Sequence, residues 1–132
     1  MTTGLVVTKI VGVYDADGGA MGEAKYFVGH LLGRLECSLC DITHGPVRRK
    51  KSFDEFRSQL SVPFEVVHRN ERDSEVEAAT RDALPCVVAR TEAGWVVVLA
   101  RDELSAFGGE VDELERGLHH ALFARGLTLP GS

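Results

Sequence analysis

Long apolar runs and a secretory leader are both missing from this sequence. The longest apolar stretches, residues 5–13 and 95–100, are interrupted or far shorter than the roughly 20 residues that a helix needs to cross a bilayer. The first residues carry no basic leader ahead of an apolar segment, and no small-residue cleavage site follows one. We therefore expect no membrane-spanning helix and a cytoplasmic location.

Cysteine and positive charge are also scarce. The 132 residues contain three cysteines, and their formal net charge is -5. A reducing cytoplasm disfavours a permanent disulfide, so metal binding and transient redox chemistry become the favoured roles for these cysteines. The negative charge gives no general attraction to nucleic acid or to anionic membranes. One exception is a basic run that is either a solvated loop or a contact for a protein partner or a small anionic ligand: Arg48, Arg49, Lys50 and Lys51.

The rest of the composition is that of an ordinary globular chain. Hydrophobic residues make up 44% and charged residues 27%, and a chain of 132 residues can bury one hydrophobic core but not two. No linker, repeat or low-complexity tract interrupts it. We therefore expect residues 1–132 to form a single domain.

The pattern of apolar residues predicts a mixture of strands and helices. Runs of β-branched residues, two of them separated only by the turn-forming TEAG, predict strands at residues 5–14, 64–68, 85–90 and 94–100. Apolar positions at three- and four-residue steps predict helices at residues 21–32, 53–60, 74–83 and 111–125.

The order of these elements, together with the stretch ALPCVVA, resembles the thioredoxin-like superfamily, and within it a glutaredoxin-like domain. In that family the second half begins with a strand that follows a cis proline, and Pro85 stands at the matching place. The resemblance implies an α/β fold with a central mixed sheet of about four strands flanked by helices. It also implies that residues 36–61 are a helical insertion after the first helix.

The dithiol of that family is missing from its expected place. Thioredoxin-like oxidoreductases carry C-x2-C where the first strand meets the first helix, because the helix N-terminus lowers the pKa of the nucleophilic thiol. This chain has DADGGAMGE there, with Gly19 and Gly22 in place of the cysteines. Cys37 and Cys40 instead lie one helix later, inside the insertion. The resemblance therefore implies a domain that has lost the usual redox reaction.

The stretch CSLCDITH has a spacing that suits a metal site. Cys37, Cys40 and His44 form C-x2-C-x3-H, in which a short turn can aim two thiolates and an imidazole at one ion, and these soft donors favour Zn²⁺. A structural zinc ion needs a fourth ligand. We prefer His68 to His30, because the end of a predicted strand and an inserted loop can converge at one end of the sheet.

Two other interpretations of the cysteine pair stay open. In one, Cys37 and Cys40 form the reversible disulfide of a thiol-disulfide oxidoreductase. In the other, both are small buried residues of the core, which is also the interpretation that we prefer for Cys86.

A further candidate is Asp15. The strand followed by Asp15-x-Asp17-Gly18 resembles haloacid-dehalogenase-like phosphatases, in which the first carboxylate attacks phosphorus beside Mg²⁺ and the second protonates the leaving group. The later acidic motif of that family is missing, and turn formation explains these residues. The leading expectation is thus a thioredoxin-like binding or scaffold module with zinc, ahead of an oxidoreductase and a phosphatase.

Overall fold

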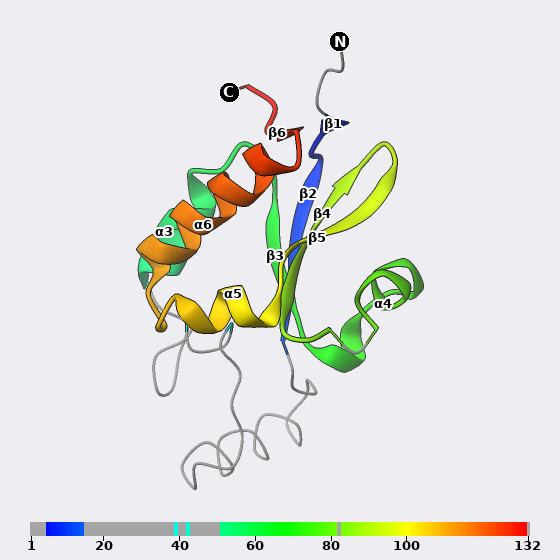
Figure 1. The fold of residues 1–132 in the computed structure, drawn as a ribbon, viewed down its shortest axis with the longest axis horizontal. Helices are drawn as coiled ribbons and strands as arrows, with labels where there is room; N and C mark the ends of the chain where they lie inside the picture. Colours follow the sequence, from blue (N-terminus) through cyan, green and yellow to red (C-terminus); the bar gives the residue numbers. More distant parts are fainter. Residues whose placement is uncertain (1–4, 15–38, 40–41, 43–50, 82, 132) are drawn as a thin grey trace, which may run out of the picture.

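The computed structural model describes residues 5–14, 39, 42, 51–81 and 83–131, and these form a mixed α/β fold around one four-stranded sheet (Figure 1). The sheet contains β2 (Lys9–Val13), β3 (Phe64–Val67), β4 (Cys86–Thr91) and β5 (Gly94–Leu99), in the spatial order β3-β2-β4-β5. β2 runs parallel to β3, whereas β4 is antiparallel to both β2 and β5. The expectation of an α/β fold with a mixed sheet of four strands is confirmed.

The two central strands, β2 and β4, form the buried part of the sheet. Their β-branched residues pack on both faces, and Cys86 to Ala89 are fully buried. β4 and β5 are joined by a two-residue turn at Glu92 and Ala93, and Gly94 takes a positive φ of 110° as the chain reverses. The predicted hairpin is therefore confirmed.

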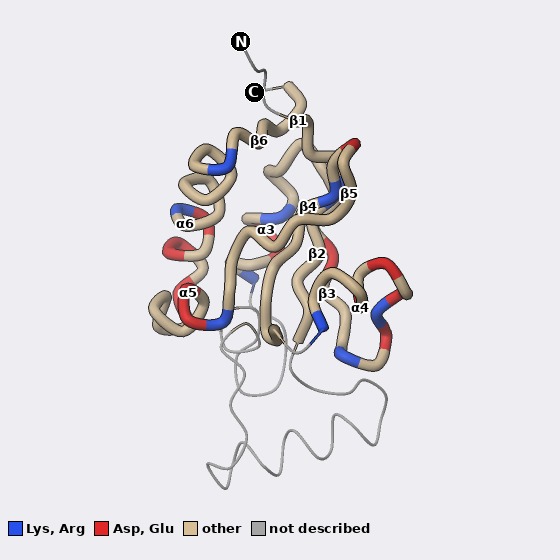
Figure 2. The backbone as a smooth tube through the Cα atoms, turned by 45° about the vertical axis from the view of Figure 1, so that its right-hand side comes forward, with Lys and Arg blue, Asp and Glu red and all other residues tan. Residues whose placement is uncertain are grey.

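Helices cover both faces of the sheet. One face carries α3 (Lys51–Ser58), α5 (Arg101–Ala106) and α6 (Val111–Ala124), and the other carries α4 (Ser74–Thr80). Figure 2 shows this separation from a second side, with the sheet standing between α4 and the pair α5 and α6. The larger cluster of buried side chains lies under α3 and α6, and a smaller cluster lies under α4.

The described end of the predicted 36–61 insertion packs into the main core. Phe53 and Phe56 of α3 are buried against Phe64 of β3, and Leu39 and Ile42 are fully buried in the same cluster. Leu39 has room because Gly12 of β2 has no Cβ: one placed there would lie 3.0 Å from Leu39 Cδ2. The described residues of this segment therefore contribute side chains to the main hydrophobic core.

The predicted helices at 74–83 and 111–125 are confirmed, with the first ending three residues early. α4 begins after Asp73, whose Oδ1 accepts a hydrogen bond of 2.9 Å from the backbone N–H of Val76, and it ends at Thr80. The predicted helix at 21–32 lies outside the described residues. None of the helices in the described part of the chain is long and apolar enough to cross a membrane.

The first predicted strand is divided into two. Residues Leu5–Val6 form β1, which pairs in parallel with β6 (Leu127–Thr128), and only Lys9–Val13 join the main sheet. The change of partner is visible in the backbone, because Val7 donates to the carbonyl of Thr128 at 2.8 Å while Thr8 donates to that of Arg90 at 2.9 Å. The end of the chain is thereby tied to the beginning of the sheet.

Gly117 on α6 allows a close contact that predicts a stability change. A Cβ there would lie 2.8 Å from Cε1 of Phe107 and closer still to its Cζ. Overpacking of this kind costs about 1–3 kcal/mol, against a helix-propensity gain of up to about 1 kcal/mol, so we expect Gly117→Ala to destabilise the protein by about 1–2 kcal/mol in urea unfolding. In a Phe107→Ala background the same substitution should become neutral or stabilising. An equal cost in both backgrounds would exclude the ring contact as its cause.

Candidate functional site

The carboxyl ends of β2 and β3 meet at one edge of the sheet and bring Tyr14 next to His68. The two strands are parallel and in register, with Val13 opposite Val67, and the N–H of Tyr14 donates to the carbonyl of Val67 at 2.9 Å. The rings of Tyr14 and His68 meet edge to face, with centroids 5.1 Å apart and planes at 66°. Because Tyr14 is buried, one side of the His68 ring is held against the core.

Glu71 contacts the same histidine at both its backbone and its ring. His68 precedes a single 3-10 turn, η1 (Arg69–Glu71), and Glu71 Oε1 accepts the backbone N–H of His68 at 2.8 Å and lies 2.9 Å from its Nδ1. These contacts lower the pKa of Glu71, the backbone hydrogen bond from His68 most of all. An ionised carboxylate can only accept, so Nδ1 is the donor in this contact, and Nε2 is the ring nitrogen that Glu71 does not contact.

Cys86 lies nearby in the sheet but on its other face. It is paired with Val13, yet it belongs to the cluster under α4, whereas Tyr14 belongs to the cluster under α6. It is fully buried, and burial raises the pKa of its thiol to about 11 even though the Arg72 guanidinium acts in the opposite direction. A neutral buried thiol is a poor nucleophile and a poor metal ligand, so the prediction that Cys86 is a core residue is confirmed.

The peptide bond before Pro85 has the conformation that the family resemblance implies for this place. The Leu84–Pro85 bond is cis, and the carbonyl of Leu84 accepts a hydrogen bond of 2.6 Å from Nε of Arg101 at the start of α5. This contact ties the segment before β4 to the helix that follows β5.

Of the four predicted zinc ligands, the structure describes His68 alone. Cys37, Cys40 and His44 lie outside the described residues, as do Asp15 and the rest of the DADGG loop. The same holds for the basic run, of which only Lys51, exposed at the start of α3, is described. Within residues 5–14, 39, 42, 51–81 and 83–131, no three His, Cys, Asp or Glu side chains are grouped so as to hold a metal ion.

Searches against protein-family models, curated proteins and solved structures gave no match to this chain.

The sequence analysis selected His68 as a candidate ligand but did not identify the residues that contact its ring, Tyr14 and Glu71. The spacing of Glu71 could have predicted its contact, because a carboxylate three residues after a histidine faces that histidine across one helical turn. Tyr14 had no such signal, since its contact with His68 depends on the register of two strands that are far apart in the chain.

Proposed function

We propose that this protein is a thioredoxin-like binding or scaffold module without the family's dithiol, which holds zinc through Cys37, Cys40, His44 and His68. The order of its strands and helices, the strand order β3-β2-β4-β5 and the place of Pro85 directly before β4 support the thioredoxin-like assignment. The buried neutral thiol of Cys86 leaves Cys37 and Cys40 as the cysteines available for chemistry. In a reducing cytoplasm both would be thiols ready to bind a soft metal ion.

The orientation of His68 is the observation that carries the zinc proposal. Histidines that bind zinc nearly always donate their second ring N–H to a carboxylate, a carbonyl or water, which fixes the tautomer and raises the basicity of the ligating nitrogen. Glu71 provides this contact at 2.9 Å from Nδ1, and Tyr14 fixes the ring plane. Nε2 is then the nitrogen that would bind the metal.

The four residues suit a structural rather than a catalytic zinc ion. Two thiolates and two neutral imidazoles complete a tetrahedral shell and balance the charge of Zn²⁺, leaving no open position for substrate. In this proposal the metal fastens the segment from Cys37 to His44 to the end of β3, where His68 lies. The basic run Arg48 to Lys51 would then be presented to an acidic protein partner or a small anionic ligand.

Metal content and affinity test this proposal. Protein purified without added metal should contain one zinc ion per chain by elemental analysis and native mass spectrometry. His68→Ala should lower zinc affinity at least tenfold, and Glu71→Gln should lower it by about 10–100-fold, since loss of such an orienting partner typically has that effect. His120→Ala is the matched control, because His120 is exposed on α6 and should leave the affinity unchanged.

The outcome that would overturn the proposal is equally specific. Protein with fully reduced cysteines and no stoichiometric zinc or iron would exclude the metal site. If Cys37 and Cys40 also formed a reversible disulfide near cytosolic potentials, the oxidoreductase would become the better hypothesis.

A further inference from the structure

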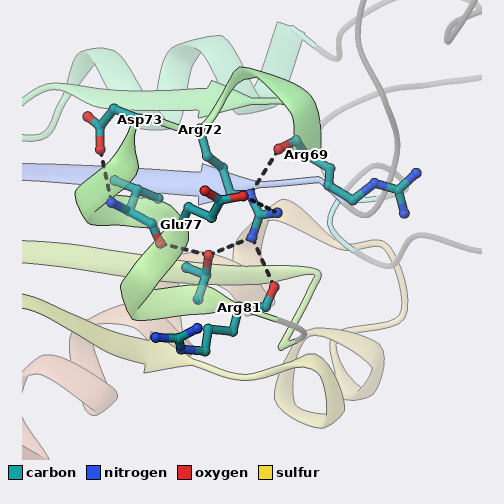
Figure 3. A network of polar contacts seen from close by, with 7 residues as sticks. Arg69, Arg72, Asp73, Glu77 and Arg81 are labelled. Atoms are coloured by element: carbon teal, nitrogen blue, oxygen red, sulfur yellow. Dashed lines mark hydrogen bonds and ion pairs between the residues drawn. The ribbon is translucent and has the colours of Figure 1, made fainter.

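Arg72 is a charged residue that the fold places almost out of contact with water. It follows η1 directly, and its side chain is only 10% exposed. Figure 3 shows its guanidinium lying between η1 and the end of α4, next to the labelled residues Arg69 and Arg81.

The guanidinium joins η1 to the end of α4 through three hydrogen bonds. Nε donates to the carbonyl of Arg69 at 2.9 Å, within η1. Nη1 donates to Thr80 Oγ1 at 3.0 Å and to the carbonyl of Arg81 at 2.9 Å, at the end of α4. Thr80 in turn donates to the carbonyl of Val76 at 2.7 Å, so the hydroxyl that receives Arg72 is itself fixed to the helix.

These partners are mostly neutral, and this points to a geometric role. The carboxylate of Glu77 is 3.9 Å from Nη2 and is 67% exposed, so it compensates little of the cost of burying the charge. An apolar side chain would fill the same space without that cost. The planar, forked guanidinium can instead reach several acceptors at fixed angles, which an ammonium group cannot do.

The segment that Arg72 holds is the one that carries His68 and Glu71. η1 has three residues, and so short a 3-10 turn is not stable without outside contacts. His68 lies at its start and Glu71 at its end, so the distance between their side chains depends on the turn being kept. The carbonyl of Arg69, inside this turn, is the atom that Arg72 binds.

We propose that Arg72 is a positioning residue for the metal site: by fixing η1 to the end of α4, it keeps the His68–Glu71 pair in the orientation that binds zinc. The inference rests on the proposed function. Arg72 does not bind the metal in this proposal. It keeps the ligand His68 in its binding orientation in the metal-free protein as well.

Amide hydrogen exchange and zinc affinity test this role. Arg72→Met removes the three hydrogen bonds and keeps the length of the side chain, and Arg72→Lys keeps the charge. In metal-free protein, Arg72→Met should speed exchange of the His68 and Glu71 amides at least tenfold, because these amides close the turn. Its zinc affinity should fall about tenfold, like that of a variant lacking an orienting carboxylate. Arg72→Lys, a milder change, should give smaller effects in the same direction.

Asp73→Ala separates positioning from general stability. It removes the cap of α4, namely the bond from Val76 N–H to Asp73 Oδ1, but leaves the contact between Arg72 and Arg69 in place. We expect it to lower the melting temperature without a change in exchange at His68 or in zinc affinity.

Two results would overturn the role of Arg72. One is wild-type exchange at His68 and Glu71 in both Arg72 variants, and the other is equal acceleration in Arg72→Met and Asp73→Ala. If wild-type protein bound no zinc, the proposed function would fail, while exchange in the metal-free protein would still decide whether Arg72 holds η1. The two failures are therefore distinguishable.

Discussion

Replacing Phe53 with alanine should lower the free energy of unfolding by about 3–5 kcal/mol, the range for a large aromatic side chain removed from a packed core. Phe53 is fully buried, and its ring centroid lies 5.6 Å from that of Phe64 at 86° and 6.3 Å from that of Phe56 at 48°. Edge-to-face pairs of this kind add about 0.5–1.5 kcal/mol to the burial of their area. Urea unfolding followed by circular dichroism measures the change.

Phe123 provides the matched control for this prediction. It is also a phenylalanine on a helix, but it is 83% exposed on α6, so Phe123→Ala should change stability by less than about 0.5 kcal/mol. A cost below about 1 kcal/mol for Phe53→Ala would mean that α3 is not held in the core. A cost in the expected range would show that the segment following Cys37, Cys40 and His44 is firmly anchored at its far end.

The main sheet and α6 could be predicted from sequence because several local signals agree there. The β-branched run of β4, the two-residue turn at Glu92 and Ala93 and the run of β5 all indicate the same hairpin. The stripe that begins at Val111 has acidic residues in its first turn and a glycine soon after its end, as a helix requires. Agreement between independent signals is what made these elements predictable.

Elements defined by distant partners could not be predicted in the same way. β1 and β6 have two residues each and exist because opposite ends of the chain meet. α5 has six residues and was not expected; its start is marked only by Glu103, whose Oε1 accepts the N–H of Ala100 at 2.9 Å. Short elements carry too few residues for a period to show, so tertiary contacts decide them.

In the candidate site, too, local sequence predicts some features while distant contacts decide others. His68 was predicted as a ligand from residue type and its place at the end of a strand, but the reason that it is well oriented lies in Tyr14, Glu71 and Arg72. In sequence, Arg72 is one charge among many in the stretch HRNERDSE and looks like a solvated residue. Only the turn that folds its side chain back onto Arg69 distinguishes it. Residue type predicts the chemistry of a site, whereas register and turn geometry decide its orientation.

Raising the pH above 9 should destabilise the protein through Cys86, and this is the second large effect that we expect. Burial raises the pKa of this thiol to about 11 in the folded protein, whereas in the unfolded chain it has its ordinary value near 9.0. Below pH 9 both states keep the proton, and the thiol adds no pH dependence. Between pH 9 and pH 11 the unfolded chain releases the proton more readily, so stability falls as the pH rises.

The size of this effect follows from the shift of about two pKa units. At about 1.4 kcal/mol per unit, the full loss above pH 11 is about 3 kcal/mol, of which about 1–2 kcal/mol is lost by pH 10. Cys86→Ala removes the titrating group, so the comparison of the two proteins cancels the contributions of the other ionisable residues. We expect the free energy of unfolding of the wild type to fall by about 1–2 kcal/mol more than that of the variant between pH 7 and pH 10.

The rate of alkylation is an independent measure of the accessibility and ionisation of the Cys86 thiol. Because Cys86 is fully buried and neutral at pH 8, iodoacetamide should modify it only when the protein unfolds, at a rate that rises with added urea. Parallel pH profiles for wild type and Cys86→Ala, or rapid alkylation of Cys86 in native protein, would show that the thiol is accessible and ionisable at the start of β4. Cys86 would then join His68 as a candidate for chemistry at this end of the sheet, and the assignment of reactivity to Cys37 and Cys40 alone would be wrong.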